Sequence, residues 1–150
     1  MTEPTLYPES GFLRLRIDLA YDGTNFSGWG KQPDRRTVQE EVEKALTTAT
    51  QSKIETIVAG RTDAGVHAIG QVIHVDVPNT LNLDELSYKL NRMLDTDVRI
   101  MKVSVVTGPF NARFSALSRH YTYKILDGNQ TIPPLDRLDV APWYLSLIHI

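Results

Sequence analysis

The sequence contains no cysteine and no long apolar run. Without cysteine, disulfides, thiolate zinc sites and thiol nucleophiles are all excluded. No window approaches the roughly 18 apolar residues of a membrane span, and the amino terminus MTEPTLYPES lacks the basic and apolar stretches of a secretory signal. These absences predict a cytoplasmic, cofactor-poor enzyme or binding domain with no membrane span and no secretory signal.

The composition is otherwise close to that of an average globular protein. The 150 residues are 41% hydrophobic and 23% charged, with a net charge of −2. This length suffices for one domain that buries about 68–70% of its unfolded surface. The composition excludes a collagen, a coiled coil or a disordered tail, and the net charge argues against a surface that is basic throughout.

One segment departs from this balance of charge. Residues 110–126, FNARFSALSRHYTYKIL, contain Arg113, Arg119 and Lys124 and no acidic residue, with aromatic residues between them. Such a basic strip can follow a phosphate backbone while its rings stack on bases. A strand with an ordinary solvated face is the alternative interpretation.

The spacing of apolar residues predicts an α+β fold. Residues 1–11 show no periodicity and are predicted to be a disordered lead-in. Thr37 and Glu40 form a capping box that begins one helix, and Asn82 with Glu85 begins a second. Alternation predicts strands over residues 13–21, 54–59, 69–77, 98–106 and 120–126.

The resulting order, β-α-β-β-α-β with one extra strand, is that of the ferredoxin-like split βαβ fold, with two helices on one face of an antiparallel sheet. The other face needs a partner, which could be RNA, a second subunit or a further part of the chain. Residues 127–150 are predicted to be loop-like, and their last residues, SLIHI, form a short apolar run that suggests a truncated end.

The loop at residues 59–68, AGRTDAGVHA, holds the residues best suited to chemistry. A turn needs only its Asp and Gly, which leaves Arg61 and His67 unexplained. An ionised Asp63 could attack an electrophilic carbon, and Arg61 could keep it ionised or contact a phosphate. A metal site formed by Asp63, His67 and His74 is less favoured, because these residues lack a standard ligand spacing.

The loop at residues 24–36 carries Phe26 and Trp29 among several glycines. It contains neither a GxxxxGK[ST] nor a GxGxxG motif, so the sequence does not support ATP or NAD binding. Phe26 and Trp29 either fill the core under this loop or contact RNA.

Several motifs together resemble the tRNA pseudouridine synthase A family, in family order and at family spacing. They are Ala20-Tyr21-Asp22-Gly23-Thr24, Phe26, Gly28-Trp29, Gln32, Thr37-Val38-Gln39, GRTDAGVHA, Gly70-Gln71-Val72, Phe110, Ala112-Arg113-Phe114-Ser115-Ala116 and Arg119-x-Tyr121-x-Tyr123. The nine-residue motif is the most specific of them. Gly30 stands where the family often has Gln, and Asn111 where it often has Asp or His. At these two positions we expect the details of RNA contact to differ from those of other family members.

The resemblance implies an isomerase that converts uridine to pseudouridine in the anticodon arm of tRNA, without cofactor or metal. It implies that Asp63 is the catalytic carboxylate, which attacks either C1′ or C6, that Arg61 assists flipping of the uridine, and that Tyr121 stacks on its base. The further RNA contacts that we expect are Lys31, Arg113, Arg119, Lys124 and His67.

The resemblance also concerns the organisation of the whole protein. Family members are about twice this length, have two ferredoxin-like halves around the active cleft, and are homodimers. Residues 12–126 would be the N-terminal catalytic subdomain, in a fragment with an incomplete site, and SLIHI departs from the family continuation. The alternatives are a non-catalytic, RRM-like RNA-binding module and a small assembly domain. The strand GQVIHVDV lacks the aromatic residues of an RRM.

Overall fold

The computed structural model describes residues 5–128 and 130–143. The chain divides into two compact units, residues 1–117 and 118–150. The main elements of the first unit, in chain order, are β1 (Phe12–Tyr21), α1 (Val38–Thr50), β2 (Ile57–Val58), β3 (Ala68–Pro78), α2 (Leu86–Met93) and β4 (Val98–Val106). A short 3-10 helix, Gly23–Asn25, follows β1.

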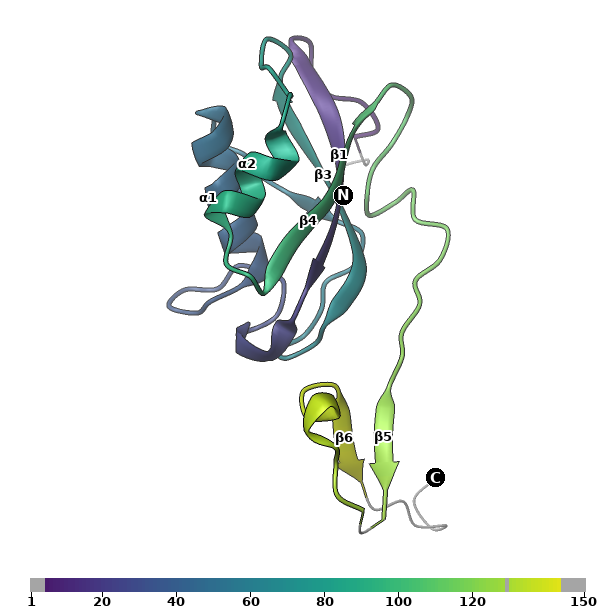
Figure 1. Cartoon of the computed structure of the whole chain (residues 1–150). Helices are drawn as coiled ribbons and strands as arrows, with labels where there is room; N and C mark the ends of the chain where they lie inside the picture. Colours follow the sequence, from purple (N-terminus) through teal and green to yellow (C-terminus); the bar gives the residue numbers. More distant parts are fainter. Residues whose placement is uncertain (1–4, 129, 144–150) are drawn as a thin grey trace. The chain divides into compact units, whose positions relative to one another are not determined.

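The four strands of the first unit form one sheet in the order β2-β3-β1-β4. Each neighbouring pair is antiparallel. Figure 1 shows α1 and α2 on the same face of this sheet. The arrangement is that of the split βαβ motif and confirms the predicted α+β, ferredoxin-like fold.

Helix α1 begins where the capping box predicts. Thr37 is the N-cap, and its Oγ1 accepts a hydrogen bond of 3.4 Å from the Glu40 amide. Glu40 and Glu41 in the first turn also interact favourably with the helix dipole. The buried side chains of α1 include Val38, Val42 and Leu46 at helical spacing, so one apolar face of the helix packs on the sheet.

Helix α2 begins three residues later than predicted, because its N-cap is Glu85 and not Asn82. Asn82 Oδ1 accepts the Asp84 amide at 2.8 Å, which forms a turn instead of a helix cap. Glu85 then adopts a left-handed backbone with φ 60°, and the helix runs from Leu86. The short helix is held by Leu86 and Leu90, which are buried in the core.

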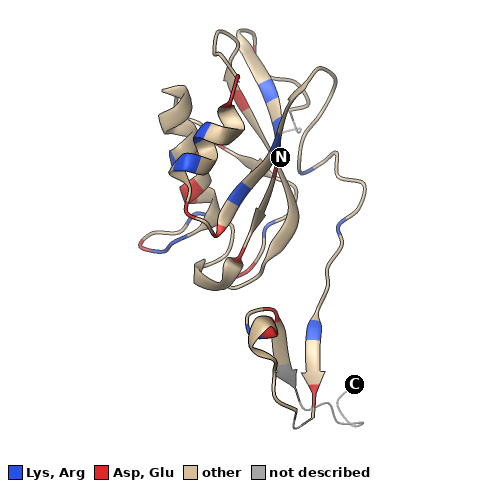
Figure 2. Ribbon diagram, viewed as in Figure 1, with Lys and Arg blue, Asp and Glu red and all other residues tan. Residues whose placement is uncertain are grey.

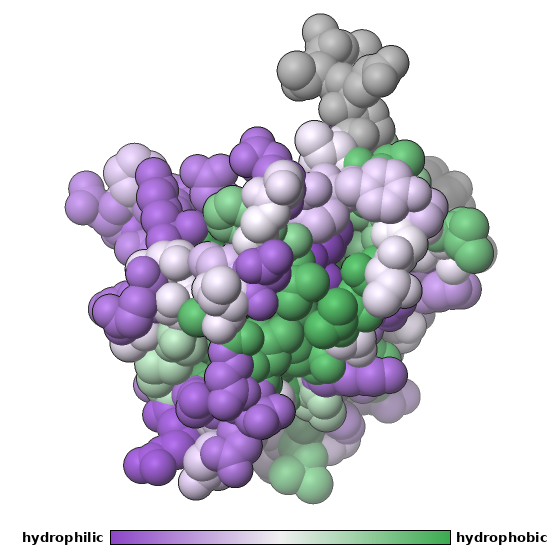
Figure 3. Space-filling view, turned by 90° about the horizontal axis from the view of Figure 1, so that it is seen from above, coloured by the Kyte–Doolittle hydropathy of each residue, from purple (hydrophilic) through white to green (hydrophobic). Residues whose placement is uncertain are grey.

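The hydrophobic core lies between the sheet and the two helices. Alternate residues of β1 and β3 point into it, and their side chains are fully buried: Leu15, Ile17, Leu19, Ile73, Val75 and Val77. At the end of the unit where β1 begins, Leu81 and Leu83 are only partly buried against this core. Figure 3, which views the molecule from above, shows an apolar area bordered by hydrophilic residues.

The opposite face of the sheet is partly covered by two segments that Arg14 holds. Its guanidinium forms an ion pair of 2.8 Å with Asp76 and donates at 2.7 Å to the carbonyl oxygens of Thr5 and Phe110. Arg14 is 2% exposed, so this charge is buried and needs these partners. Residues 5–11 contain no helix or strand. They are nevertheless tied to β1, because Arg14 donates hydrogen bonds to the carbonyl oxygens of Thr5 and Tyr7.

The second unit contains β5 (Lys124–Asp127), a 3-10 helix (Pro134–Asp136) and β6 (Val140–Trp143). β5 and β6 pair in parallel as a separate two-stranded sheet. The extra strand predicted over 120–126 is thus shorter and does not join the four-stranded sheet. The described residues of the predicted loop-like segment include β6, and SLIHI lies outside the described residues. No helix in the described part of the chain is long and apolar enough to cross a membrane.

Candidate active site

Asp63 lies exposed in the loop between β2 and β3, and the loop's backbone is anchored on both sides of it. Before Asp63, the carbonyl oxygen of Thr62 accepts the Trp29 amide at 3.0 Å. After it, the Gly65 amide donates to the Phe26 carbonyl oxygen at 3.2 Å, and Val66 N donates to Asp63 O at 3.1 Å. The loop that follows β1 therefore fixes where the carboxylate stands.

Two glycines allow these loops to pack backbone against backbone. Gly28 has φ +84°, and a Cβ placed on it would lie 2.7 Å from the Thr62 carbonyl oxygen. A Cβ on Gly23 would collide with the carbonyl oxygen of Val66. Side chains at these positions would push the Asp63 loop away, which explains glycine at both.

Buried side chains hold the same loop from within. The Tyr21 hydroxyl lies 2.7 Å from Thr62 Oγ1. Gln71 Nε2 donates to the Tyr21 hydroxyl at 3.2 Å and to the Gly60 carbonyl oxygen at 2.8 Å. Tyr21 is 5% exposed and Gln71 8%, so these polar groups are satisfied inside the protein and not by bulk water.

Arg61 is exposed and extends over Gly30. Its Nη1 atom lies 3.4 Å from the position that a Cβ on Gly30 would occupy. Among the described residues, no hydrogen bond or ion pair joins Arg61 to Asp63. Both side chains are exposed and therefore accessible to a ligand, and the role of Arg61 beside Asp63 stays a prediction.

His67 faces the turn after β1. Its Nδ1 accepts the Gly23 amide at 2.9 Å and lies 3.2 Å from an Asp22 carboxylate oxygen. Because Nδ1 accepts a hydrogen from Gly23, the contact with Asp22 is not a hydrogen bond donated by that nitrogen. Hydrogen bonds from Thr24, with a smaller effect of His67, lower the pKa of Asp22. His67 thus braces the loop, while its contact with RNA stays a prediction.

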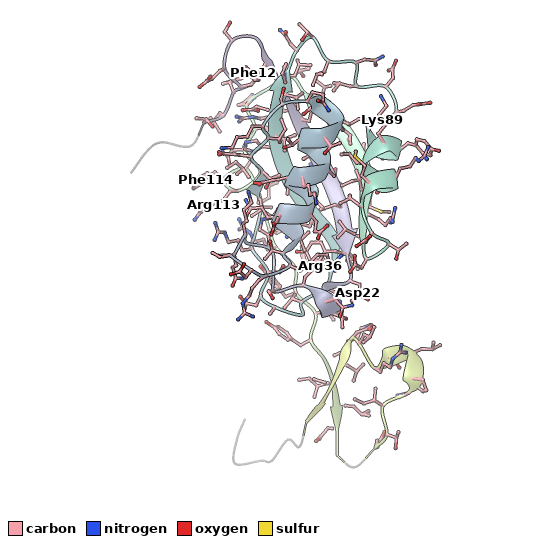
Figure 4. All side chains as sticks on the ribbon, turned by 90° about the vertical axis from the view of Figure 1, so that its left-hand side faces the viewer. Phe12, Asp22, Arg36, Lys89, Arg113 and Phe114 are labelled. Carbon is pink, nitrogen blue, oxygen red and sulfur yellow. The ribbon has the colours of Figure 1, made fainter. Side chains whose placement is uncertain are left out.

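Arg36 supports the loop from a position that the sequence did not single out. Its guanidinium carbon lies 4.0 Å from the centroid of the Phe26 ring, and it forms ion pairs with Asp97 at 2.7 Å and Asp95 at 3.1 Å. The hydrogen bond to Asp97 is the main reason that the pKa of Arg36 is raised. Figure 4 shows Arg36 and Asp22 at the same end of the first unit. No local spacing could reveal partners 61 residues apart.

Lys31, predicted to contact RNA, already has an acidic neighbour. Its Nζ lies 3.3 Å from Oε2 of Glu43, whose side chain is only 7% exposed. The Lys31 amide also donates to Gln39 Oε1 at 2.9 Å, so α1 holds this part of the loop. The ion pair reduces the positive charge that Lys31 can offer a phosphate.

Arg113 and Phe114 lie beside each other, with the guanidinium 5.3 Å from the ring centroid (Figure 4). Asn111 Oδ1 accepts both of their amides, at 3.0 and 3.2 Å. The Ala112 amide donates to Nδ1 of buried His74 at 2.9 Å, which ties this segment to β3. Burial, with a smaller contribution from Arg14, lowers the pKa of His74 to about 4.

The remaining predicted contacts, Arg119, Tyr121 and Lys124, belong to the second unit. Tyr121 is 62% exposed, and Lys124 forms an ion pair of 2.8 Å with Asp139 that raises its pKa. Figure 2 shows basic and no acidic positions on the ribbon between β4 and β5, as the sequence indicates. In the first unit, by contrast, Arg61, Asp63 and His67 share one loop.

The histidines and carboxylates considered for a metal site do not converge. His67 Nδ1 accepts the Gly23 amide, whereas His74 Nδ1 accepts the Ala112 amide. Within residues 5–128 and 130–143, no group of three or more such side chains is placed to hold a metal ion. The loop instead presents a carboxylate and a guanidinium to solvent on an anchored backbone, an arrangement suited to attack on a docked ligand.

Comparison with known proteins gives a consistent result. A family model described as tRNA pseudouridine synthase matches residues 19–115. A tRNA pseudouridine synthase A of Frankia casuarinae is 51% identical over 89% of this chain and 49% of its own length. Those of Streptomyces griseus and Cutibacterium acnes are 51% and 49% identical, each over 86% of this chain and 47% of its own length. The chain spans about half the length of these curated relatives.

Proposed function

This chain belongs to the tRNA pseudouridine synthase family, and we propose that it supplies the catalytic carboxylate, Asp63, for converting uridine to pseudouridine in the anticodon arm of tRNA. The observation that carries the proposal is the anchored loop of residues 59–68 inside the region that the family model matches. There Asp63 is exposed, while the backbone before and after it is fixed by hydrogen bonds to the neighbouring loop.

The reaction needs a nucleophile and no external reactant. The bond between C1′ and N1 of the nucleotide breaks, the uracil turns, and a bond forms between C1′ and C5. The hydrogen on C5 leaves as a proton and N1 gains one, so no atom is lost overall. The Asp63 carboxylate attacks either C1′ or C6 to form a transient covalent link. A side chain exposed on a rigid loop can reach such a carbon only after the base leaves its stack.

Extrusion of the uridine costs a few kcal/mol, which protein contacts must offset. In the proposal, Arg61 occupies the space left in the stack or binds the adjacent phosphate, since its guanidinium is exposed two residues from Asp63. The exposed ring of Tyr121 stacks on the flipped base, and such a contact contributes about 1–3 kcal/mol.

The proposed contacts to the tRNA backbone are cationic or polar side chains on both units: Lys31, Arg113, Arg119, Lys124 and His67. Arg113 stands on a segment that Asn111 and His74 hold against the sheet. The position of its backbone is therefore set before RNA binds, which reduces the backbone entropy lost in binding. Such contacts position the RNA without reading its sequence.

We propose that the site is completed by a region equivalent to the second half of the relatives, because this chain covers only about half of their length. The complete protein would act in the cytoplasm, as a homodimer, without a cofactor. The RRM-like alternative is less favoured, because β3, a central strand, contains no Phe, Tyr or Trp.

The test uses tRNA labelled with tritium at C5 of its uridines, since pseudouridine formation releases this hydrogen. Two proteins are compared: this chain alone, and a chimaera in which it precedes the second half of the Frankia casuarinae relative. We expect tritium release by the chimaera and none above background by the chain alone. A folded chimaera that binds tRNA but releases no tritium would contradict the proposed function. Release at equal rates by both would contradict the incomplete site.

A further inference from the structure

We propose that Tyr21, Thr62 and Gln71 form a partly buried hydrogen-bond network that positions Asp63 for reaction. This inference rests on the proposed function of Asp63 and assigns a role to three residues that do not touch the substrate. The three come from different parts of the fold: Tyr21 ends β1, Gln71 lies in β3, and Thr62 directly precedes Asp63 in the loop.

The hydrogen-bonding capacity of Gln71 is largely used within this network. Its Nε2 group donates to the Gly60 carbonyl oxygen at 2.8 Å and to the Tyr21 hydroxyl at 3.2 Å, and its Oε1 accepts the Val72 amide at 3.1 Å. Because the Tyr21 oxygen accepts from Gln71, its own hydrogen is available for Thr62 Oγ1, 2.7 Å away. The network thus runs from β3 through β1 to the loop.

The network holds the loop at the two residues that flank Arg61. Gly60 is held through its carbonyl oxygen by Gln71, and Thr62 through its hydroxyl by Tyr21. The Thr62 carbonyl oxygen separately accepts the Trp29 amide at 3.0 Å. Thr62 is therefore fixed by both its side chain and its backbone. Because Asp63 is the next residue, the direction of the Asp63 side chain depends on this fixed backbone.

The network has no evident purpose in packing. A Phe ring at Tyr21 could keep the contact with Trp29, whose ring centroid is 6.3 Å away, without burying a hydroxyl. A buried polar group destabilises the protein unless it is satisfied, so a hydroxyl here is favoured only because it binds the loop. The Asp63 carboxylate has no hydrogen-bond partner within the described residues, so its placement depends on this backbone support.

Catalysis requires the attacking oxygen to stand within a fraction of an ångström of its productive position, and a displacement of about 1 Å can cost about 100-fold in rate. We therefore expect Tyr21→Phe in the chimaera to lower kcat by about 10- to 100-fold and to leave KM for tRNA within about twofold. Thr62→Val should have the same effect, and Thr62→Ser, which restores a hydroxyl, should recover most of the rate. Tyr88→Phe, which removes an exposed hydroxyl from α2, is the matched control.

The double variant Tyr21→Phe/Thr62→Val separates positioning from general weakening of the fold. If the two hydroxyls act only through each other, the double variant is no slower than either single one, because one broken link already disables the network. Independent, multiplying losses would overturn the inference. So would a Tyr21→Phe enzyme that keeps the wild-type kcat.

A second measurement needs no activity and uses the 150-residue chain alone. We expect Tyr21→Phe to speed amide hydrogen exchange at Trp29 and Gly65 by about tenfold or more, and to leave the Leu15 and Val75 amides in the sheet unchanged. Unchanged exchange at Trp29 and Gly65 would overturn the inference, whether or not Asp63 is the catalytic residue. Faster exchange together with a fully active Asp63→Asn chimaera would instead contradict the proposed function and leave the network as a structural support of the loop.

Discussion

A Cβ on Gly28 would stand 2.7 Å from the carbonyl oxygen of Thr62, the residue before Asp63. The hydrogen bond from the Trp29 amide to that oxygen joins the same two loops. The close approach at Gly28 and this hydrogen bond therefore set the same distance between the two loops. The position of the candidate nucleophile thus depends on the absence of a side chain in another loop.

Gly28→Ala should therefore disturb the site by two routes, the collision with Thr62 and the positive φ of +84°. We expect the free energy of unfolding to fall by about 3 kcal/mol, because overpacking adds to left-handed strain. Gly65→Ala is the matched control: its φ is +80° and a Cβ there has no atom within 4 Å, so strain alone applies, at about 1 kcal/mol. Urea unfolding of both variants measures the difference, and equal losses would contradict the importance of the contact.

Stability should depend on pH through His74. Its pKa is about 4 in the folded chain, against an ordinary value of 6.5. The unfolded chain therefore binds a proton at a higher pH than the folded one does, and the free energy of unfolding falls as the pH drops from 6.5 towards 4. The full loss is about 3 kcal/mol.

His74→Asn tests this pH dependence, because an Asn oxygen can accept the Ala112 amide without titrating. We expect the variant to have a flatter stability profile between pH 4 and 6.5, measured by urea unfolding at each pH. A wild-type profile in the variant would show that other groups cause the slope.

The two cations near the candidate site should differ in their effect on tRNA binding. Arg61 is exposed and has no carboxylate partner among the described residues, whereas Lys31 lies 3.3 Å from Glu43. Each phosphate contact releases counterions, so Arg61→Gln should reduce the slope of log Kd against log salt by about one. Lys31→Gln should reduce it by less. Titrations of the chimaera at several salt concentrations measure both, and a larger reduction for Lys31 would reverse our assignment.

The sequence predicted the parts of the fold that are determined locally. The capping box at Thr37 specified the start of α1, and alternation specified β1, β3 and β4 almost to their ends. Hydrophobic period and cap chemistry act over a few residues, so such features can be identified from a single chain. The late start of α2 shows the limit, since the left-handed backbone of Glu85 has no distinct local signal.

Features that depend on distant partners were not predicted. β6 contains Pro142, which argues against a strand, yet it pairs with β5. The burial of Arg14 has no local signal in the sequence, because its partners Thr5, Asp76 and Phe110 surround the guanidinium only in the folded chain. For the candidate site, the sequence predicts roles for Asp63 and Arg61, which stay predictions, whereas the network of Tyr21, Thr62 and Gln71 becomes visible only in the three-dimensional fold.

The most direct test of the account is the single-turnover rate of tritium release from C5-labelled tRNA by the chimaera, with Asp63 and with Asp63→Asn. The Asp63→Asn substitution removes one charge from an exposed side chain, so folding and tRNA affinity should be nearly unchanged. We predict that the rate falls by about 10⁴-fold or more while Kd for tRNA stays within a few fold. An Asp63→Asn protein that isomerises uridine within tenfold of the unaltered rate would contradict the claim that this carboxylate is the nucleophile.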